Sequence, residues 1–322
     1  RNKFINSTIQ KYFQNNQVLN GLKEALDSEY KNILFEGAYG SSLAVYSSLA
    51  LNTTKKPNIF ILKDKEEASY FINDLENILE KKILFFPESY RRTYQFSETD
   101  NSNILLRAEV LNKLNSSKKP IIITYPEALS EKVISRNELR KQTIKLQIGQ
   151  TCDIENLIEE FEKLHFVQSD FVTDPGQFSV RGGIVDVFSF ANEYPYRIEF
   201  NEDELESIRT FDINTQLSIE NHKNVVIIPN TEAKKTNSNK TSFINYLPSN
   251  SQLWIKDISF VSGKIDDLFQ KSQNESQRNN KNIKLDFKDL FCSGSNFIDE
   301  IKTYKIIELE RPILNPLKTI SL

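Results

Sequence analysis

One stretch of the sequence has the location and part of the spacing of a phosphate-binding loop. An apolar run ends at Gly37, and Gly37-Ala-Tyr-Gly-Ser-Ser42-Leu43-Ala44 leads from it into a segment with helical apolar spacing. A P-loop reads G-x-x-x-x-G-K-[ST] at such a turn, because backbone N–H groups and the Lys hold the phosphates and the hydroxyl holds magnesium. Ser42, Leu43 and Ala44 replace the second Gly, the Lys and the hydroxyl residue. We therefore expect Gly37, Gly40, Ser42, Leu43 and Ala44 to form a strand–turn–helix joint that serves packing. We expect this joint to bind no ATP, metal or other cofactor and to contain no catalytic residue.

A second stretch, Phe171 to Ser218, alternates apolar and polar residues as β-strands do. Pro175-Gly176 is a strong turn signal, and Gly182-Gly183 interrupts the alternation where a bulge or bend is expected. Tyr196 to Phe200 alternates again, and after a polar turn a return strand begins at Leu205. The pattern predicts a meander of three or four antiparallel strands.

Two arginines in this stretch could bind a protein partner. Arg181 precedes Gly182-Gly183, whose missing side chains would let a partner approach the backbone, and Arg197 lies in the following strand. A guanidinium pairs with a carboxylate through two parallel hydrogen bonds, so two arginines on one face suit an acidic partner surface. The alternative is that each arginine neutralises an acid of its own domain, such as Glu199 or Asp203. We expect that structural role for a third arginine, Arg209.

Other kinds of site are poorly supported by the sequence. His165 and His222 are the only histidines and lie far apart, which disfavours a histidine metal site or a catalytic triad. Cys152 and Cys292 lack the spacing of a zinc site or a disulfide framework and suit a reducing cytoplasm. We expect a cytoplasmic protein without a metal.

The composition is that of an ordinary soluble protein, with 322 residues of which 39% are hydrophobic and 26% charged. No run of eighteen apolar residues is present, so we expect no membrane span. Residues 143–228 hold six basic and sixteen acidic side chains, whereas the remainder holds 35 and 28. The acidic segment is a poor surface for nucleic acid, which requires clustered Lys and Arg. The chain contains no Met, and we interpret it as the front end of a longer protein.

Strand and helix patterns alternate on both sides of the acidic segment, which predicts an α/β fold with a parallel sheet. Within that segment the pattern predicts a strand at 143–148, a helix at 153–164 and the meander. We therefore expect a discontinuous α/β domain, residues 1–142 plus 229–322, with an inserted α+β domain at 143–228. Residues 271–282 are the best candidate for a mobile loop. Strands are expected at 32–37, 58–62, 83–86, 120–125, 251–256 and 304–309, and helices at 1–31, 42–51, 64–79, 103–114, from 126, at 241–246 and at 258–269.

The motif Gly176-x-Phe178-x-x-Arg181-Gly182-x-x-x-Asp186-x-Phe188, followed by Arg197-Ile-Glu-Phe, resembles domain 2 of the UvrB family. It is more similar still to the same module in the bacterial transcription-repair coupling factors (Mfd). The lost Lys and hydroxyl at Leu43 and Ala44 also favour these factors, because this loss is typical of their amino-terminal module. The resemblance implies the domain order 1a, 2, 1b, which agrees with the insertion.

The resemblance also implies partners. The inserted domain would bind the excision-repair protein UvrA through Arg181 and Arg197, and a downstream domain could mask that face. Two positions depart from the family pattern: Asn201 stands where an aromatic contact is expected, and Ser179 stands where UvrB often has another Arg. In the longer protein, an ATP-dependent DNA translocase, other domains would bind RNA polymerase and DNA.

Two other functions are possible from the sequence. One is half of an ATP-dependent helicase like UvrB, which the degenerate loop and the lack of an Asp-Glu box after a strand oppose. The other is a regulatory clamp folded back on a larger motor, which is compatible with UvrA binding. Aromatic and basic residues after Pro87 could stack on bases, but we expect them to line the sheet edge; they are Tyr90, Arg91, Arg92, Tyr94 and Phe96.

Overall fold

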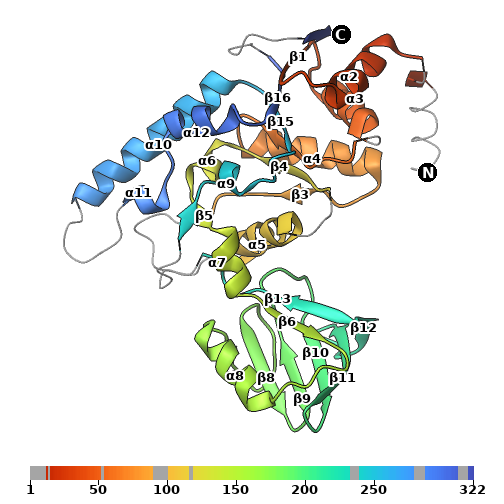
Figure 1. Cartoon of the computed structure of the whole chain (residues 1–322), viewed down its shortest axis with the longest axis vertical. Helices are drawn as coiled ribbons and strands as arrows, with labels where there is room; N and C mark the ends of the chain where they lie inside the picture. Colours follow the sequence, from red (N-terminus) through yellow and green to blue (C-terminus); the bar gives the residue numbers. More distant parts are fainter. Residues whose placement is uncertain are drawn as a thin grey trace. The chain divides into compact units, whose positions relative to one another are not determined.

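The computed structural model describes residues 12–13, 15–51, 54–89, 101–115, 119–232, 239–278, 287–310 and 318–322 (Figure 1). The chain divides into two compact units. The first comprises Arg1–Gln95, Lys113–Val133 and Lys240–Leu322, and the second comprises Phe96–Asn112 and Ile134–Asn239. The predicted insertion, residues 143–228, lies inside the second unit.

The first unit is built on a seven-stranded sheet in which all neighbouring strands are parallel, as the sequence predicts. Every residue of β2, β4 and β15 is buried, which is typical of parallel strands covered on both faces. The edge strand β17 was not expected from the sequence. In spatial order the strands are β17 (Lys318–Ser321), β1 (Asn32–Glu36), β16 (Lys305–Glu308), β15 (Gln252–Ile255), β2 (Asn58–Ile61), β4 (Ile121–Thr124) and β3 (Leu84–Phe85).

Several helices of this unit begin next to a side chain that caps them. Asp64, for example, accepts a hydrogen bond from the Glu67 amide at 2.8 Å and caps the helix that follows. The helices are α2 (Gln17–Asp27), α3 (Ser41–Leu51), α4 (Lys65–Leu79), α6 (Pro126–Ser130), α9 (Phe243–Tyr246), α10 (Ile258–Arg278), α11 (Phe287–Leu290) and α12 (Gly294–Ile301), and α5 (Asn101–Asn115) belongs partly to each unit.

The expected mobile loop at 271–282 is wrong over its first eight residues, because α10 continues to Arg278. The segment is polar but contains neither Gly nor Pro, and its Lys, Gln, Glu and Arg residues are good helix formers. Residues 279–282 lie outside the described part of the chain.

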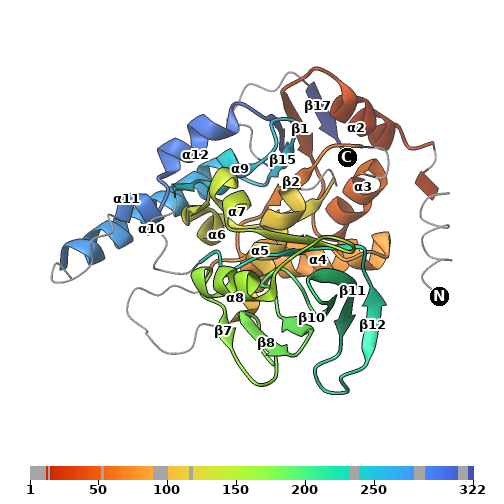
Figure 2. The same ribbon diagram turned by 60° about the horizontal axis from the view of Figure 1, so that its bottom comes forward.

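The second unit contains the predicted antiparallel meander within a six-stranded sheet (Figure 2). Strands β8 to β12 pair antiparallel in sequence order, and β7 pairs with β8 in parallel. The strands are β12 (Ser218–Asn221), β11 (Glu204–Phe211), β10 (Tyr196–Asn201), β9 (Ile184–Val187), β8 (Gln177–Arg181) and β7 (Val167–Gln168). A separate pair joins β6 (Ile144–Gln147) to β13 (Asn224–Ile227), and the helices of this unit are α7 (Arg136–Lys141) and α8 (Ile154–Lys163). β5 (Val133–Ile134) belongs partly to each unit, and β14 (Lys240–Thr241) belongs to the first.

Gly182-Gly183 forms a two-residue hairpin turn between β8 and β9, not a bulge inside one strand. Gly182 has φ +59°, a left-handed conformation that favours glycine. Gly183 lies so close to the Phe200 carbonyl that a Cβ atom would be 2.8 Å from the oxygen. The two glycines are therefore required by the turn and by its packing on β10.

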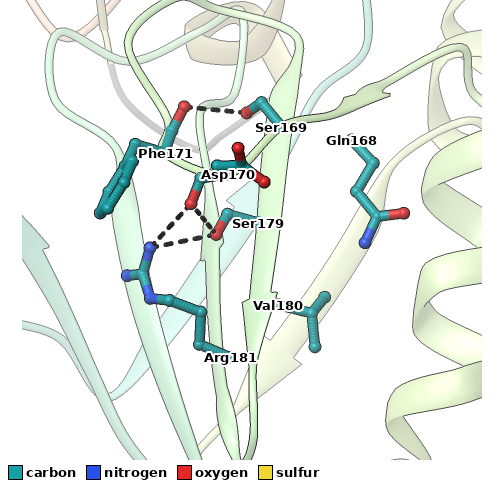
Figure 3. A pocket seen from close by; sticks show the side chains of 7 residues that line it. All are labelled: Gln168, Ser169, Asp170, Phe171, Ser179, Val180 and Arg181. Carbon is teal, nitrogen blue, oxygen red and sulfur yellow. Dashed lines mark hydrogen bonds between the residues drawn. The ribbon is translucent and has the colours of Figure 1, made fainter.

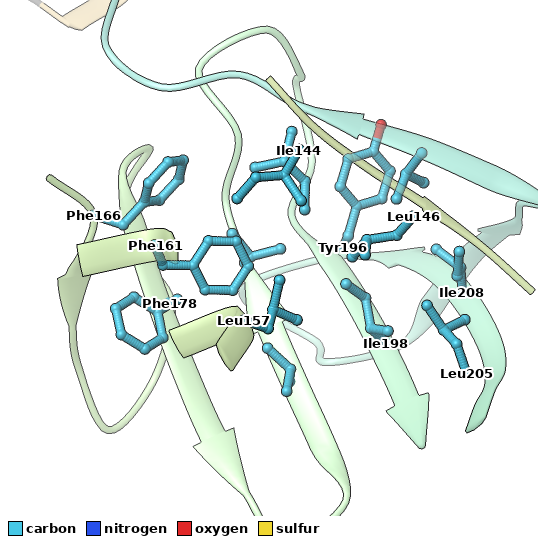
Figure 4. Packing of buried hydrophobic residues seen from close by; sticks show 14 of the residues in the cluster. Ile144, Leu146, Leu157, Phe161, Phe166, Phe178, Tyr196, Ile198, Leu205 and Ile208 are labelled. Atoms are coloured by element: carbon cyan, nitrogen blue, oxygen red, sulfur yellow. The ribbon is translucent and has the colours of Figure 1, made fainter. Parts of the chain in front are cut away.

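One face of the six-stranded sheet carries the apolar core of this unit. Asp153 caps α8 by accepting hydrogen bonds from the amides of Glu155 and Asn156. Leu157 and Phe161 of α8 lie against the sheet (Figure 4). The other members of the cluster come from β6, the segment before β7, the meander strands and β13; they are Ile144, Leu146, Phe166, Phe178, Val185, Val187, Tyr196, Ile198, Phe200, Leu205, Ile208, Val225 and Ile227.

We predict that residues 143–228 fold when they are excised from the chain. All fifteen members of the cluster lie between Ile144 and Ile227, and the pairing of β6 with β13 holds the two ends of the segment together. The excised segment should unfold in one cooperative thermal transition, measured by circular dichroism. A gradual, non-cooperative loss of signal would show that the boundary is misplaced.

Candidate interaction face on the six-stranded sheet

The face of the six-stranded sheet opposite the apolar core is polar. Successive side chains of a strand point to opposite faces, so the residues between the core positions line this second face. The strand register aligns them in rows that cross the sheet. One row is Ser179, Asp186, Arg197 and Arg209, and the next is Arg181, Ile184, Glu199 and Ser207.

Asp186 lies at the centre of this face and binds both arginines that the sequence singled out. Arg197 donates from Nε to one carboxylate oxygen at 2.7 Å and from Nη2 to the other at 2.8 Å. Arg181 donates from Nη2 to the second oxygen at 2.6 Å. The Asp186 side chain is 2% exposed, Arg197 is 14% exposed and Arg181 is 37% exposed. A nearly buried carboxylate thus fixes two guanidinium groups, of which Arg181 is the more accessible.

Arg181 is also fixed by the loop that precedes β8 (Figure 3). Its Nη1 donates to the Asp170 carbonyl at 3.1 Å and to Ser179 Oγ at 3.2 Å, and Ser179 Oγ donates to the same carbonyl at 3.0 Å. The guanidinium lies 5.2 Å from the centre of the Phe171 ring. Together with Gln168, Ser169 and Val180, these residues line a shallow open pocket.

Arg197 is held on its other side by the turn that precedes β12. Its Nη2 donates to Gln216 Oε1 at 2.8 Å, and its guanidinium lies over the Phe211 ring at 4.2 Å from the ring centre. The ring attracts the cation through its quadrupole. Because three neighbours hold Arg197, its orientation is set before any partner arrives.

A second ion pair lies beside the Asp186 cluster. Arg209 donates from Nη2 to one oxygen of Glu199, and Ser207 Oγ donates to the other at 2.6 Å. These two hydrogen bonds, from Arg209 first and Ser207 second, lower the pKa of Glu199 to about 2. The pair confirms the structural role expected for Arg209.

The structure revises how the two candidate arginines relate. They lie on β8 and β10, which are separated by β9, yet both reach the same face and the same acid. The acid is Asp186, not Glu199 or Asp203. In the sequence motif, Asp186 is the polar residue of the apolar run Ile184 to Phe188. The motif alone does not show that this acid binds both arginines.

Ser179 and Asn201, the other candidate contact residues, differ in accessibility. Ser179 is 1% exposed and is not available as a surface contact; it acts instead as a hydrogen-bond partner of Arg181. Asn201 is exposed at the end of β10. Of the two glycines expected to let a partner approach, only Gly182 has open space around it, since Gly183 packs on Phe200.

The turn that begins at Gly37 joins β1 to α3. Gly37 and Gly40 have φ values of +88° and +53°, and α3 begins at Ser41. Leu43 and Ala44, which stand at the Lys and hydroxyl positions, are 5% and 0% exposed. The side chains at these positions therefore pack inside the unit.

The chain end lies against this turn. The Leu322 amide donates to the Glu36 carbonyl at 3.1 Å, and a Cβ atom on Gly37 would be 2.9 Å from Leu322 Cβ. A side chain at position 37 therefore has no room, and this side of the turn is occupied.

Charged side chains meet just beyond the carboxyl ends of β2, β15 and β16, where open α/β sheets usually bind ligands. Lys63 Nζ lies 2.7 Å from Glu310 Oε2, and Lys256 binds both Glu67 and Glu310. The four groups neutralise one another.

The aromatic and basic residues Tyr90, Arg91, Arg92, Tyr94 and Phe96 lie outside the described residues. Within the described ranges no group of three or more His, Cys, Asp or Glu side chains could hold a metal ion. Both cysteines are free, and burial raises the pKa of the Cys292 thiol to about 12. None of the described helices has the length and apolar character needed to cross a membrane.

We predict that Glu199→Gln removes a pH-dependent part of the stability. The folded state lowers the pKa of Glu199 from its ordinary 4.5 to about 2. The carboxylate therefore stabilises the fold above about pH 4.5 and loses this effect as the pH falls toward 2. The difference in unfolding free energy between wild type and Glu199→Gln should shrink from pH 7 to pH 3 in urea titrations.

The matched control is Glu206→Gln, which changes an exposed residue of β11. It should change stability little at either pH. A Glu199→Gln effect that is constant from pH 7 to pH 3 would contradict the prediction.

Comparison with known proteins agrees with this arrangement. Residues 144–232 match the family described as the UvrB interaction domain. The transcription-repair-coupling factor of Bacillus subtilis (strain 168) is 30% identical over 217 residues, which are 67% of this chain and 18% of that protein. The factor of Rickettsia typhi is 33% identical over 193 residues, 56% of this chain and 16% of that protein. The factor of Escherichia coli (strain K12) is 22% identical over 173 residues, 54% of this chain and 15% of that protein.

The matched part thus amounts to less than a fifth of each relative's length. Three lines of evidence agree: the matched domain, the relatives and the insertion of a β-meander into a parallel α/β unit. The chain therefore belongs to the transcription-repair-coupling factor family, and its residues 144–232 form a UvrB interaction domain.

Proposed function

We propose that this chain is a non-catalytic interaction module that recruits UvrA through the polar face of the six-stranded sheet. The observation that carries the proposal is the pair of arginines that Asp186 fixes on one exposed face. In the longer protein, RNA polymerase and DNA would be bound by other domains, so that recruitment of UvrA occurs at stalled transcription complexes.

The electrostatics of the face support an acidic partner surface. Three arginines, Arg181, Arg197 and Arg209, lie on it beside two carboxylates, Asp186 and Glu199, whereas residues 143–228 as a whole are strongly acidic. The face is thus the locally basic part of an acidic domain. Complementary charge chiefly sets orientation and association rate, and buried pairs add affinity.

Pre-organisation is the second supporting argument. Binding usually costs free energy because interface side chains lose rotamer freedom. Arg181 and Arg197 already form hydrogen bonds with Asp186, Asp170, Ser179 and Gln216, so that most of this cost is met during folding.

We predict that Arg181→Ala weakens UvrA binding by more than about tenfold, which corresponds to about 1.4 kcal/mol. Removing one partner of an interfacial charge pair typically costs about 2–5 kcal/mol. Arg181 is the more exposed arginine, and the variant should keep its thermal unfolding transition because Arg197 still pairs with Asp186. Binding is measured with purified UvrA by biolayer interferometry at two salt concentrations, and higher salt should weaken the complex.

Arg197 needs a more conservative substitution, because Arg197→Ala would remove two of the three hydrogen bonds to the buried Asp186 carboxylate, whereas Arg181→Ala removes one, and would therefore lower stability. Arg197→Lys keeps the charge but loses the two-pronged geometry, and it should also weaken binding. The matched control is Lys163→Ala on α8, which packs on the opposite face of the sheet, and this variant should bind like wild type. If Arg181→Ala and Arg197→Lys bind like wild type while folded, UvrA is bound elsewhere.

We also propose that the first unit does not bind nucleotide. Buried apolar side chains at positions 43 and 44 and the neutralised cluster of Lys63, Glu67, Lys256 and Glu310 support this view. Position 43 lacks the cation that would hold the phosphates, and position 44 lacks the hydroxyl that would hold magnesium. These features favour an interaction module over a helicase half.

We predict no heat of binding when magnesium-ATP is titrated into the chain in a calorimeter. A matched variant with Leu43→Lys and Ala44→Thr should also fail to bind, because both positions are buried in α3. Binding of magnesium-ATP by the unmodified chain at micromolar concentration would overturn this proposal.

A further inference from the structure

An exposed aromatic ring lies at the edge of the polar face. Phe171 is 63% exposed, although a side chain of this type usually buries most of its area. It belongs to the loop between β7 and β8 and borders the shallow pocket that also contains Arg181 (Figure 3). Exposed aromatic and arginine side chains are the groups that most often dominate the affinity of protein interfaces.

The position of Phe171 is fixed by its neighbours. Ser169 Oγ donates to the Phe171 carbonyl at 2.9 Å, and the preceding carbonyl, of Asp170, accepts from Ser179 Oγ and from Arg181 Nη1. The Arg181 guanidinium lies 5.2 Å from the ring centre. The exposed ring therefore sits on a loop held from both sides, and its ordering costs a partner little.

The strand edge beside the ring is open. β7 pairs with β8 only at Val167 and Gln168, opposite Gln177 and Phe178. No strand among the described residues continues this pairing toward Arg181. The pocket lies at this uncovered end of β8.

Arg181 keeps hydrogen-bonding capacity for a ligand at this place. Its bonds to Asp170, Ser179 and Asp186 use Nη1 and one hydrogen of Nη2. Among the described residues no group accepts a hydrogen bond from its Nε. Nε and the second Nη2 hydrogen therefore remain available to a ligand carboxylate.

We propose that Phe171 and Arg181 form one subsite, which takes a partner segment with a carboxylate next to an apolar side chain. The carboxylate binds the free edge of Arg181, and the apolar side chain packs on the exposed face of Phe171. The inference rests on the proposed function, because the partner is the one recruited through this face. It adds an apolar anchor to an interface otherwise built from charges.

The charges around the pocket agree with an acidic ligand. Asp170 is the one acid among the lining residues, and its carboxylate points away from the Arg181 guanidinium in Figure 3. Asp186 is almost fully buried behind Arg181 and already shares two guanidinium groups. A ligand carboxylate at the free edge of Arg181 thus approaches the cation without facing either acid directly.

The test is the affinity of purified UvrA for the full chain with Phe171→Ala. We expect binding to weaken by at least about fivefold, and less with Phe171→Leu, which keeps an apolar side chain. The thermal unfolding transition should stay unchanged because the ring is exposed. Tyr70→Ala is the matched control: Tyr70 is an aromatic residue of α4 in the first unit, 68% exposed, and its loss should not change binding.

A double variant distinguishes a direct contact between Phe171 and the partner from an indirect effect of Phe171 through Arg181. If Phe171 contacts the partner, Phe171→Ala should weaken binding further in an Arg181→Ala chain. If the double variant binds like Arg181→Ala alone, the ring only positions the arginine and the subsite is refuted. If Arg181→Ala and Arg197→Lys weaken binding but Phe171→Ala does not, this inference fails while the proposed function stands; if wild type does not bind UvrA, both fail.

Discussion

The polar face depends on a buried carboxylate that is shared by two guanidinium groups. Transfer of the Asp186 charge out of water is costly, and the cost is offset only if the charge is paired and hydrogen-bonded. Arg181 and Arg197 supply three hydrogen bonds to it, two of them in the side-by-side geometry that a guanidinium fork favours. The same bonds that allow Asp186 to be buried therefore fix the two arginines in space.

Strand register links this cluster to the core of the unit. A shift of one residue in β9 would turn Asp186 toward the apolar cluster and turn Val185 toward the polar face. Both faces therefore favour the same register, one by apolar packing on α8 and the other by ion pairing. The side chains of the polar face are therefore held in register with the core beneath them, which suits the proposed recognition of a partner.

Much of this arrangement was readable from the sequence. Alternation of apolar runs with helical patterns predicted the parallel sheet, and period-two alternation predicted the meander. Several short or polar elements are not predicted by the sequence pattern: β7 has two residues, β12 is exposed along its whole length, and β17 lies apart from the other strands in sequence. The short elements β5, β14, α11 and α12 are not predicted either. Very short strands and strands exposed on both faces have no apolar alternation, so the sequence does not show where they pair. The polar composition of residues 271–278 suggests a loop, but the absence of Gly and Pro and the presence of good helix formers favour the helix that the structure shows.

The sequence predicted only part of the interaction face, for a related reason. Sequence spacing suggested that Arg181 and Arg197 share a face, but it could not show that β9 intervenes with a common acid. That depends on which strands are neighbours and in what register, which are tertiary properties. Phe171 was equally hidden, because an aromatic residue next to a turn is ordinarily expected to be buried.

The two units differ in how they use charge, and this difference argues for a division of roles. At the carboxyl ends of β2, β15 and β16, lysines and glutamates of the first unit satisfy one another, leaving little unbalanced charge for a phosphate or a metal. On the six-stranded sheet the hydrogen-bonding capacity of the charged groups is not fully used. Asp186 has four lone-pair sites and two guanidinium partners, and Arg181 retains an unused edge. Because β6 pairs with β13 and every member of the apolar cluster lies within residues 144–227, the segment that carries this unused edge contains its own core. The insertion therefore contains both the proposed binding face and the core that supports it. For the proposed binding, the parallel sheet needs only to hold the two ends of the insertion.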